Sequence, residues 1–141
     1  MEKSVALYPY ETNMRNLGIA YSYMGNNKQS IKYLYKALRT KDYEIAYPHK
    51  HELDTYLYIA IYNDLYADPY TAKKISQLGI NDYPDSFELW ILSAVSDYKL
   101  NDQKEALKEA ITAYKIAPNN QTSYVLESIR NKSEPSLRKI L

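Results

Sequence analysis

The chain aligns with itself at a shift of 34 residues, and this repeat constrains the fold more than any other feature of the sequence. The matched columns hold side chains of similar size and chemistry. They include Tyr56, Trp90 and Tyr124; Leu57, Ile91 and Val125; Ile61, Val95 and Ile129; Ala72 and Ala106; Gly79 and Ala113; and Pro84 and Pro118. A repeat of this length indicates an array of small structural units that bury their apolar faces against their neighbours.

Apolar residues recur within each unit at helical spacing, as in Leu57, Ile61 and Leu65. The pattern predicts helices over 11–24, 27–45, 51–66, 69–80, 86–99, 103–116 and 120–131. Because the connections between them are short, consecutive helices are expected to pack as antiparallel pairs. The predicted fold class is therefore all-α, an antiparallel helix-hairpin array that forms an α-α superhelix.

Polar residues stand where these helices are expected to begin, and their side chains can accept hydrogen bonds from free N–H groups. Asp68 precedes a proline, which favours the first position of a helix. Asp85 and Asp102 each have a glutamate three residues later, a pattern that predicts capping boxes. Asn26 and Asn119 are predicted to cap their helices in the same way.

Composition excludes several classes of function. The formal net charge is +1, so the overall balance gives no reason to expect nucleic acid as a partner. The absence of cysteine excludes disulfides, thiolate metal sites and cysteine nucleophiles. No apolar run is long enough to predict a membrane-spanning helix, and the amino terminus does not read as a signal peptide. We expect a soluble, cytoplasmic segment that an upstream region could tether to a membrane.

Catalytic and metal chemistry has few candidates in this sequence. His49 and His51 lie near Glu52 and Asp54 in an extra segment between two repeats, and such a group could bind zinc. A histidine pair in a loop is a weak signal, and we interpret it as a solvated loop. We therefore expect no catalytic residues, no metal and no cofactor.

The repeat resembles the tetratricopeptide repeat (TPR), a helical hairpin with small residues at fixed positions and a proline near its end. The best match is the repeat 87–120, which has Trp90, Ala94, Ala106, Ala113 and Pro118 at the positions where the family has aromatic, small and proline residues. The resemblance divides the chain into repeats 11–44, 53–86 and 87–120, which are preceded by the end of another hairpin over 1–10 and followed by capping helices over 121–141. It also has departures, since Asn63 and Asp97 stand where the family has an aromatic residue.

The resemblance predicts different structural roles for the two ends of the chain. Residues 1–10 look like the end of a preceding hairpin that closes at Pro9, so we expect the natural protein to continue upstream. The alternative is a short native capping helix. If the hairpin is truncated, Val5, Leu7 and Tyr8 predict self-association through this edge. Residues 133–141 are expected to form a short final helix that acts as the carboxy-terminal cap.

The resemblance implies that partners bind the inner wall of the superhelix, which is built from the first helix of each repeat. The residues it assigns to a partner-binding groove are Arg15, Ile19, Tyr23, Leu57, Ile61, Leu65, Ile91, Val95, Tyr98 and Val125. Family members that bind a terminal carboxylate have polar residues at positions where the second and third repeats of this chain have aliphatic ones. We therefore do not expect a carboxylate-binding site, or carboxylate clamp. The groove instead suits a hydrophobic peptide or an amphipathic helix.

Two functions therefore remain open. The first is a protein-protein interaction scaffold that binds a protein or peptide partner in this groove, with no nucleic acid as a partner and no membrane span of its own. The second is a regulatory or substrate-docking domain of a larger enzyme, such as a membrane glycosyltransferase. A structural alternative also stays open, in which the superhelix fills the groove with its own last helix.

Overall fold

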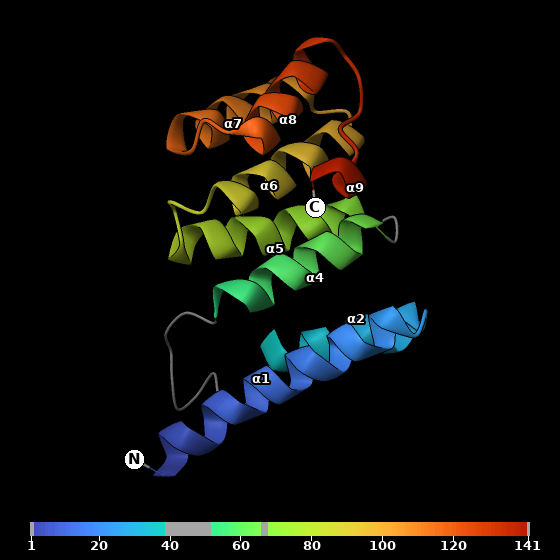
Figure 1. Ribbon diagram of the computed structural model, residues 1–141, viewed down its shortest axis with the longest axis vertical. Helices are drawn as coiled ribbons and strands as arrows, with labels where there is room; N and C mark the ends of the chain where they lie inside the picture. The colour runs from blue at the N-terminus through green and yellow to red at the C-terminus, as the bar shows by residue number, and fades with distance from the viewer. Residues whose placement is uncertain (1, 39–51, 66–67, 141) are drawn as a thin grey trace. The chain divides into compact units, whose positions relative to one another are not determined.

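The computed structural model describes residues 2–38, 52–65 and 68–140, and this part of the chain contains helices and no β-strand (Figure 1). The helices are α1 (Glu2–Tyr23), α2 (Asn27–Leu38), α4 (Leu53–Leu65), α5 (Pro69–Asp82), α6 (Phe87–Lys99), α7 (Gln103–Ile116), α8 (Asn120–Arg130) and α9 (Leu137–Ile140). The all-α prediction is thus confirmed, and α4 to α8 begin and end within two residues of the predicted bounds.

The first helix corrects one expectation. A break near Pro9 was predicted, because proline lacks an N–H group and crowds the preceding turn. Instead α1 runs without interruption from Glu2 to Tyr23, so residues 2–10 do not form a separate element that ends at the proline. The helix loses one intrahelical hydrogen bond at Pro9 and continues through the turns on either side. Self-association through this edge stays a prediction.

The chain forms two compact units, residues 1–59 and 60–141, and each is described by itself. In the first unit, α1 and α2 pack as a hairpin. Gly18 lies at their closest approach, where an added Cβ would be 2.6 Å from Leu34 Cγ and 3.0 Å from the Ser30 carbonyl oxygen. Tyr21 and Tyr33 stack across the same pair with ring centroids 5.4 Å apart.

In the second unit, α5, α6, α7 and α8 pack one against the next. Small side chains lie at the contacts between these helices and are fully buried: Ala72, Ala94, Ala106, Ala110 and Ala113. The middle helix, α6, is buried on nearly all sides between Leu89 and Asp97. Alanine at a contact lets two helix backbones approach closely, which explains why the repeat places small residues there.

The short α9 is held against α8 at the end of the second unit. Gln121 Nε2 donates to the Ile140 carbonyl oxygen at 2.6 Å, and Ser136 N donates to Tyr124 Oη at 3.0 Å. Leu137 and Ile140 of α9 are buried. The predicted short final helix is present, but it begins at Leu137 rather than at Ser133.

Tight turns join the helices, and three of them contain a residue with positive φ. These are Gly25 (78°), Asn101 (65°) and Lys132 (55°). At each turn, two backbone bonds return to the last helical turn, as when Lys132 N donates to Ile129 O and Ser133 N donates to Ser128 O, both near 3 Å. This is the Schellman ending of a helix, which satisfies free carbonyl groups and reverses the chain.

Most of the predicted caps are present. Asp68 accepts from Thr71 N and Asp102 accepts from Glu105 N. Asn26 accepts from Gln29 N at 3.3 Å. Asn119 forms a complete capping box with Thr122, whereas the structure gives Asp102 only the bond from Glu105 N.

The predicted cap at Asp85 is wrong. Ser86 caps α6 instead and accepts from Leu89 N. The reason is local, because a turn closes between Tyr83 O and Ser86 N at 3.1 Å, and this places Ser86 at the first free position of the helix.

None of the helices in the described ranges 2–38, 52–65 and 68–140 has the length and apolar character that a bilayer crossing requires.

Replacing Gly18 by alanine should destabilise the first unit. The new methyl group overlaps Leu34, and relief of such overpacking costs about 1 to 3 kcal/mol, against a gain of about 1 kcal/mol in helix propensity. Chemical denaturation should show the loss, while Asn16→Ala, at an exposed position of α1, should not lower stability. A Gly18→Ala variant as stable as Asn16→Ala would contradict the close approach.

Replacing Lys132 by glycine should stabilise the second unit by about 1 kcal/mol, because glycine adopts a positive φ without steric cost. Asn131 is the matched control, since its φ is −88° and glycine there has no such advantage. Thermal or urea unfolding of the two variants measures the difference. Equal effects of the two glycines would show that Lys132 bears no strain.

Candidate functional site

The predicted groove residues of the first unit occupy different environments. Tyr23 is 87% exposed, and Ile19 and Leu57 are partly exposed. Arg15 is engaged within the protein, because its Nη1 lies 3.3 Å from Glu52 Oε1 and donates to Thr55 Oγ1 at 3.3 Å. The guanidinium group therefore already has a carboxylate partner.

A buried carboxylate supports the same region of the first unit. Glu11 is fully buried, and its Oε2 accepts from Glu52 N and from Thr55 Oγ1, both at 2.9 Å. Glu52 N lies at the start of α4, where backbone N–H groups have no partner within the helix. Glu11 thus caps α4 from another helix and fixes the position of the residues that engage Arg15.

The predicted groove residues of the second unit are mostly buried. Ile91 is 1% exposed, and Val95 and Val125 are fully buried, whereas Ile61 and Tyr98 are partly exposed. The side chain of Leu65, also predicted for the groove, lies outside the described part of the chain.

The expectation that Ile91, Val95 and Val125 line an open trough is therefore wrong for this structure. The physical reason is that α6 is packed on nearly all sides, so its inner positions belong to the core. For Val125, which lies one helical turn after Gln121, the hydrogen bond from Gln121 to Ile140 places α9 close by. That the chain's own last helix covers part of the groove stays a prediction.

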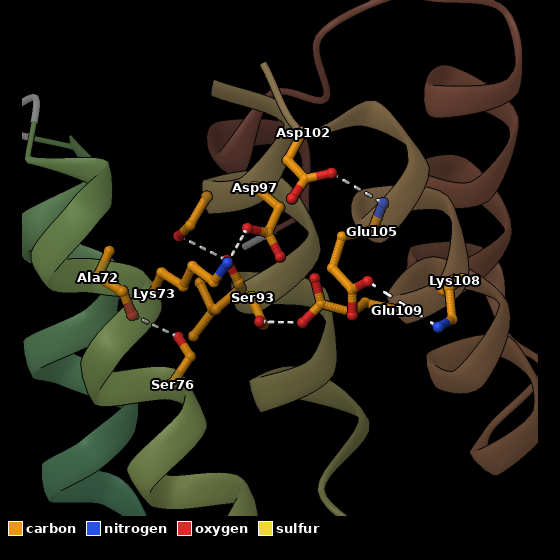
Figure 2. Close-up of polar contacts among 11 residues, drawn as sticks. Ala72, Lys73, Ser76, Ser93, Asp97, Asp102, Glu105, Lys108 and Glu109 are labelled. Atoms are coloured by element: carbon orange, nitrogen blue, oxygen red, sulfur yellow. Dashed lines mark hydrogen bonds and ion pairs between the residues drawn. The ribbon is translucent and has the colours of Figure 1, made fainter. Parts of the chain in front are cut away.

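A second set of polar residues, which we name the buried polar cluster, consists of Lys73 on α5, Ser93 and Asp97 on α6, and Glu109 on α7 (Figure 2). Lys73 Nζ lies 2.6 Å from Asp97 Oδ1, and the Asp97 side chain is fully buried. Ser93 Oγ donates a short hydrogen bond to Glu109 Oε2. Glu109 is 4% exposed, so the cluster lies within the helix packing.

This environment shifts two pKa values. Burial, reinforced by the neighbouring Asp97, raises the pKa of Glu109 from 4.5 to about 9, although the Ser93 hydroxyl opposes the shift. The hydrogen bond to Asp97 raises the pKa of Lys73 above 10.5. Lys73 therefore stays charged at neutral pH, and its contribution to stability is lost only as pH rises beyond about 10.5.

Sequence reasoning missed this cluster, although one signal was present. Asp97 stands at a repeat position where the TPR pattern has an aromatic residue. A carboxylate at such a core position requires a buried partner, and Lys73 and Glu109 could have been sought on that ground.

The cluster does not have the form of a metal or catalytic site. Lysine already occupies the position of a cation, and burial keeps substrates from Asp97. No group of three or more histidine or acidic residues in the described ranges could hold a metal ion. His49 and His51, considered above for zinc, lie outside these ranges.

Removing the cation of the cluster should destabilise the second unit strongly. Lys73→Met leaves the buried Asp97 without its cation, a change that typically costs about 3 to 5 kcal/mol. The double variant Lys73→Met/Asp97→Leu should lose less than Lys73→Met alone, because it removes both charges. Lys74→Met, at an exposed position of the same helix, is the control for urea unfolding. A Lys73 variant as stable as this control would show that the ion pair contributes nothing.

The arrangement of helix pairs is shared with solved TPR structures. The first TPR domain of Spaghetti (RPAP3), bound to the HSP90 peptide SRMEEVD, superposes with a TM-score of 0.74 and 14% identity over 87% of this chain and 92% of that chain. The Arabidopsis OM64 TPR domain superposes with a TM-score of 0.75 and 12% identity over 89% of this chain and 98% of that chain. No family model and no curated protein matches the sequence. The chain therefore has the fold of a TPR domain, an all-α array of helix hairpins.

Proposed function

We propose that this protein is a non-enzymatic protein-interaction module. The observation that carries the proposal is the surface of the second unit at the repeat's inner positions. Ile61, Tyr98 and Lys99 are partly exposed at these positions, whereas the aliphatic residues predicted on α6 and α8 are buried. A rigid helical scaffold with an apolar and aromatic edge is suited to bind a peptide or helix from another protein.

The burial of the inner aliphatic residues refines the proposed contact surface. Ile91, Val95 and Val125 act as the support beneath it, and a partner would contact Ile61 and Tyr98 rather than these three. Replacing Val95 with a charged residue would consequently test the stability of the core rather than binding, because it would leave an unpaired charge buried. Substitutions that test binding belong at the partly exposed positions.

The alternative function is a regulatory or docking domain of a larger enzyme. It would use the same partly exposed residues to hold a substrate or a subunit of that enzyme. The two proposals agree on the contact surface and differ in the partner.

The HSP90 peptide SRMEEVD, to which the RPAP3 domain is bound, should not bind this chain specifically. Its terminal carboxylate needs exposed cations, whereas Arg15 is engaged with Glu52, and Ile91 and Val95 are buried. Fluorescence anisotropy with a labelled peptide should give no more binding than a scrambled peptide of the same composition. Saturable binding that is lost in Arg15→Ala would overturn this expectation and indicate a carboxylate clamp.

The proposed function is tested directly with a displayed library of helix-forming peptides selected on the wild-type protein. We expect enriched peptides to carry apolar residues at helical spacing and to lose at least about tenfold in affinity on Ile61→Glu/Tyr98→Ala, a loss of about 1.4 kcal/mol. Leu78→Glu is the control, because Leu78 is a half-exposed aliphatic residue on α5, outside the proposed surface. Melting curves check that all variants fold. Peptides that bind the double variant and wild type equally would refute this contact surface.

A further inference from the structure

The buried polar cluster contains two carboxyl groups and only one cation. Lys73 pairs with Asp97 at 2.6 Å, while Glu109 lies on the other side of Asp97, on α7 (Figure 2). Asp97 is fully buried and Glu109 is 4% exposed. If both carboxyl groups were ionised, the cluster would bury one negative charge without a partner.

The hydrogen bonds of the cluster show where a donor is missing. Ser93 supplies a donor to Glu109 Oε2. Glu109 Oε1 and Asp97 Oδ2 are buried, and no N–H or hydroxyl group of residues 2–38, 52–65 and 68–140 donates to either oxygen. Unsatisfied buried acceptors are rare in folded proteins, and a proton on one carboxyl group would provide the missing donor.

We propose that Glu109 carries a proton at neutral pH and donates it to Asp97, so that α6 and α7 are joined by a contact that opens when the proton is lost. The second unit then contains a device that responds to alkaline pH. Below the transition, the cluster holds one positive charge, one negative charge and one neutral acid. Above it, the second carboxylate is ionised in the helix packing and pushes the two helices apart.

Other charged groups near Glu109 do not supply the missing cation. On α7 itself, Glu105 adds a further negative charge and also raises the pKa of Glu109. The charged residues of α8, which packs against α7, are Glu127 and Arg130, and both are exposed. Lys73, on α5, is already held by Asp97.

The sign of the pH dependence follows from the two pKa values of Glu109. The ordinary value is 4.5, and burial raises it to about 9 in the folded protein. Between these values the folded state holds a proton that the unfolded state has released. Stability is therefore fully present below about pH 4.5 and falls as pH rises towards 9, with the unfolding constant increasing by up to about tenfold per pH unit.

The experiment is urea unfolding between pH 5 and 9, followed by the fluorescence of Trp90, the single tryptophan, which lies on α6. Wild type should lose stability across this range. Glu109→Gln should have a flatter profile, because glutamine keeps the shape of the neutral acid and cannot ionise. Glu127→Gln, at an exposed position of α8, should retain the wild-type slope, so effects of other titrating groups, including the two histidines, cancel.

A second measurement keeps the proposal testable even if Glu109→Gln does not fold. In wild-type protein labelled with ¹³C at glutamate side chains, one carboxyl resonance should titrate near pH 9, and Glu109→Gln, if it folds, should remove it. Titration of every glutamate below pH 6 would overturn the proposal. So would identical pH profiles for Glu109→Gln and Glu127→Gln.

Discussion

The close approach of neighbouring helices through small side chains is the constraint on which the rest of this structure depends. In the second unit, alanines on the packed helices α6 and α7 are fully buried, and in the first unit Gly18 lies almost in contact with Leu34. Helices that pack this closely exclude water from the contact between them, and the larger side chains beside the contact are tightly packed. The Schellman turns make the same approach possible, because they reverse the chain within a few residues.

Close packing also determines the chemistry of the buried polar cluster. Asp97 replaces an aromatic residue of the repeat pattern, and a carboxylate in this position cannot remain buried alone. Lys73 from the preceding helix and Glu109 from the following one complete its surroundings. Buried ion pairs often give no more stability than apolar side chains of the same volume. The pH response proposed for the cluster is a consequence of having two acids for one base.

The surface that we propose for a partner is smaller than the repeat pattern predicts. The pattern predicts that Ile91, Val95 and Val125 face inward, and in the structure all three are buried in the core. Ile61, Tyr98 and Lys99 are partly exposed at the predicted inner positions of the second unit. In the first unit, Arg15 is paired with Glu52, whose backbone N–H donates to the buried Glu11. A chain with this surface differs in its proposed ligand from a domain that clamps a carboxylate, even though the fold is shared.

The sequence by itself determined the all-α fold, the helix bounds from α4 to α8 and most of the caps, because these depend on periodicity, small residues and turn chemistry within a few positions of each other. It did not determine that α1 continues through Pro9 or that Ser86 rather than Asp85 caps α6, since both outcomes rest on local backbone geometry. Tertiary structure alone decided which inner residues are covered and which polar residues meet. Periodicity specifies the direction in which a side chain points, but burial and ion pairing depend on residues that are distant in sequence, as Lys73, Asp97 and Glu109 are.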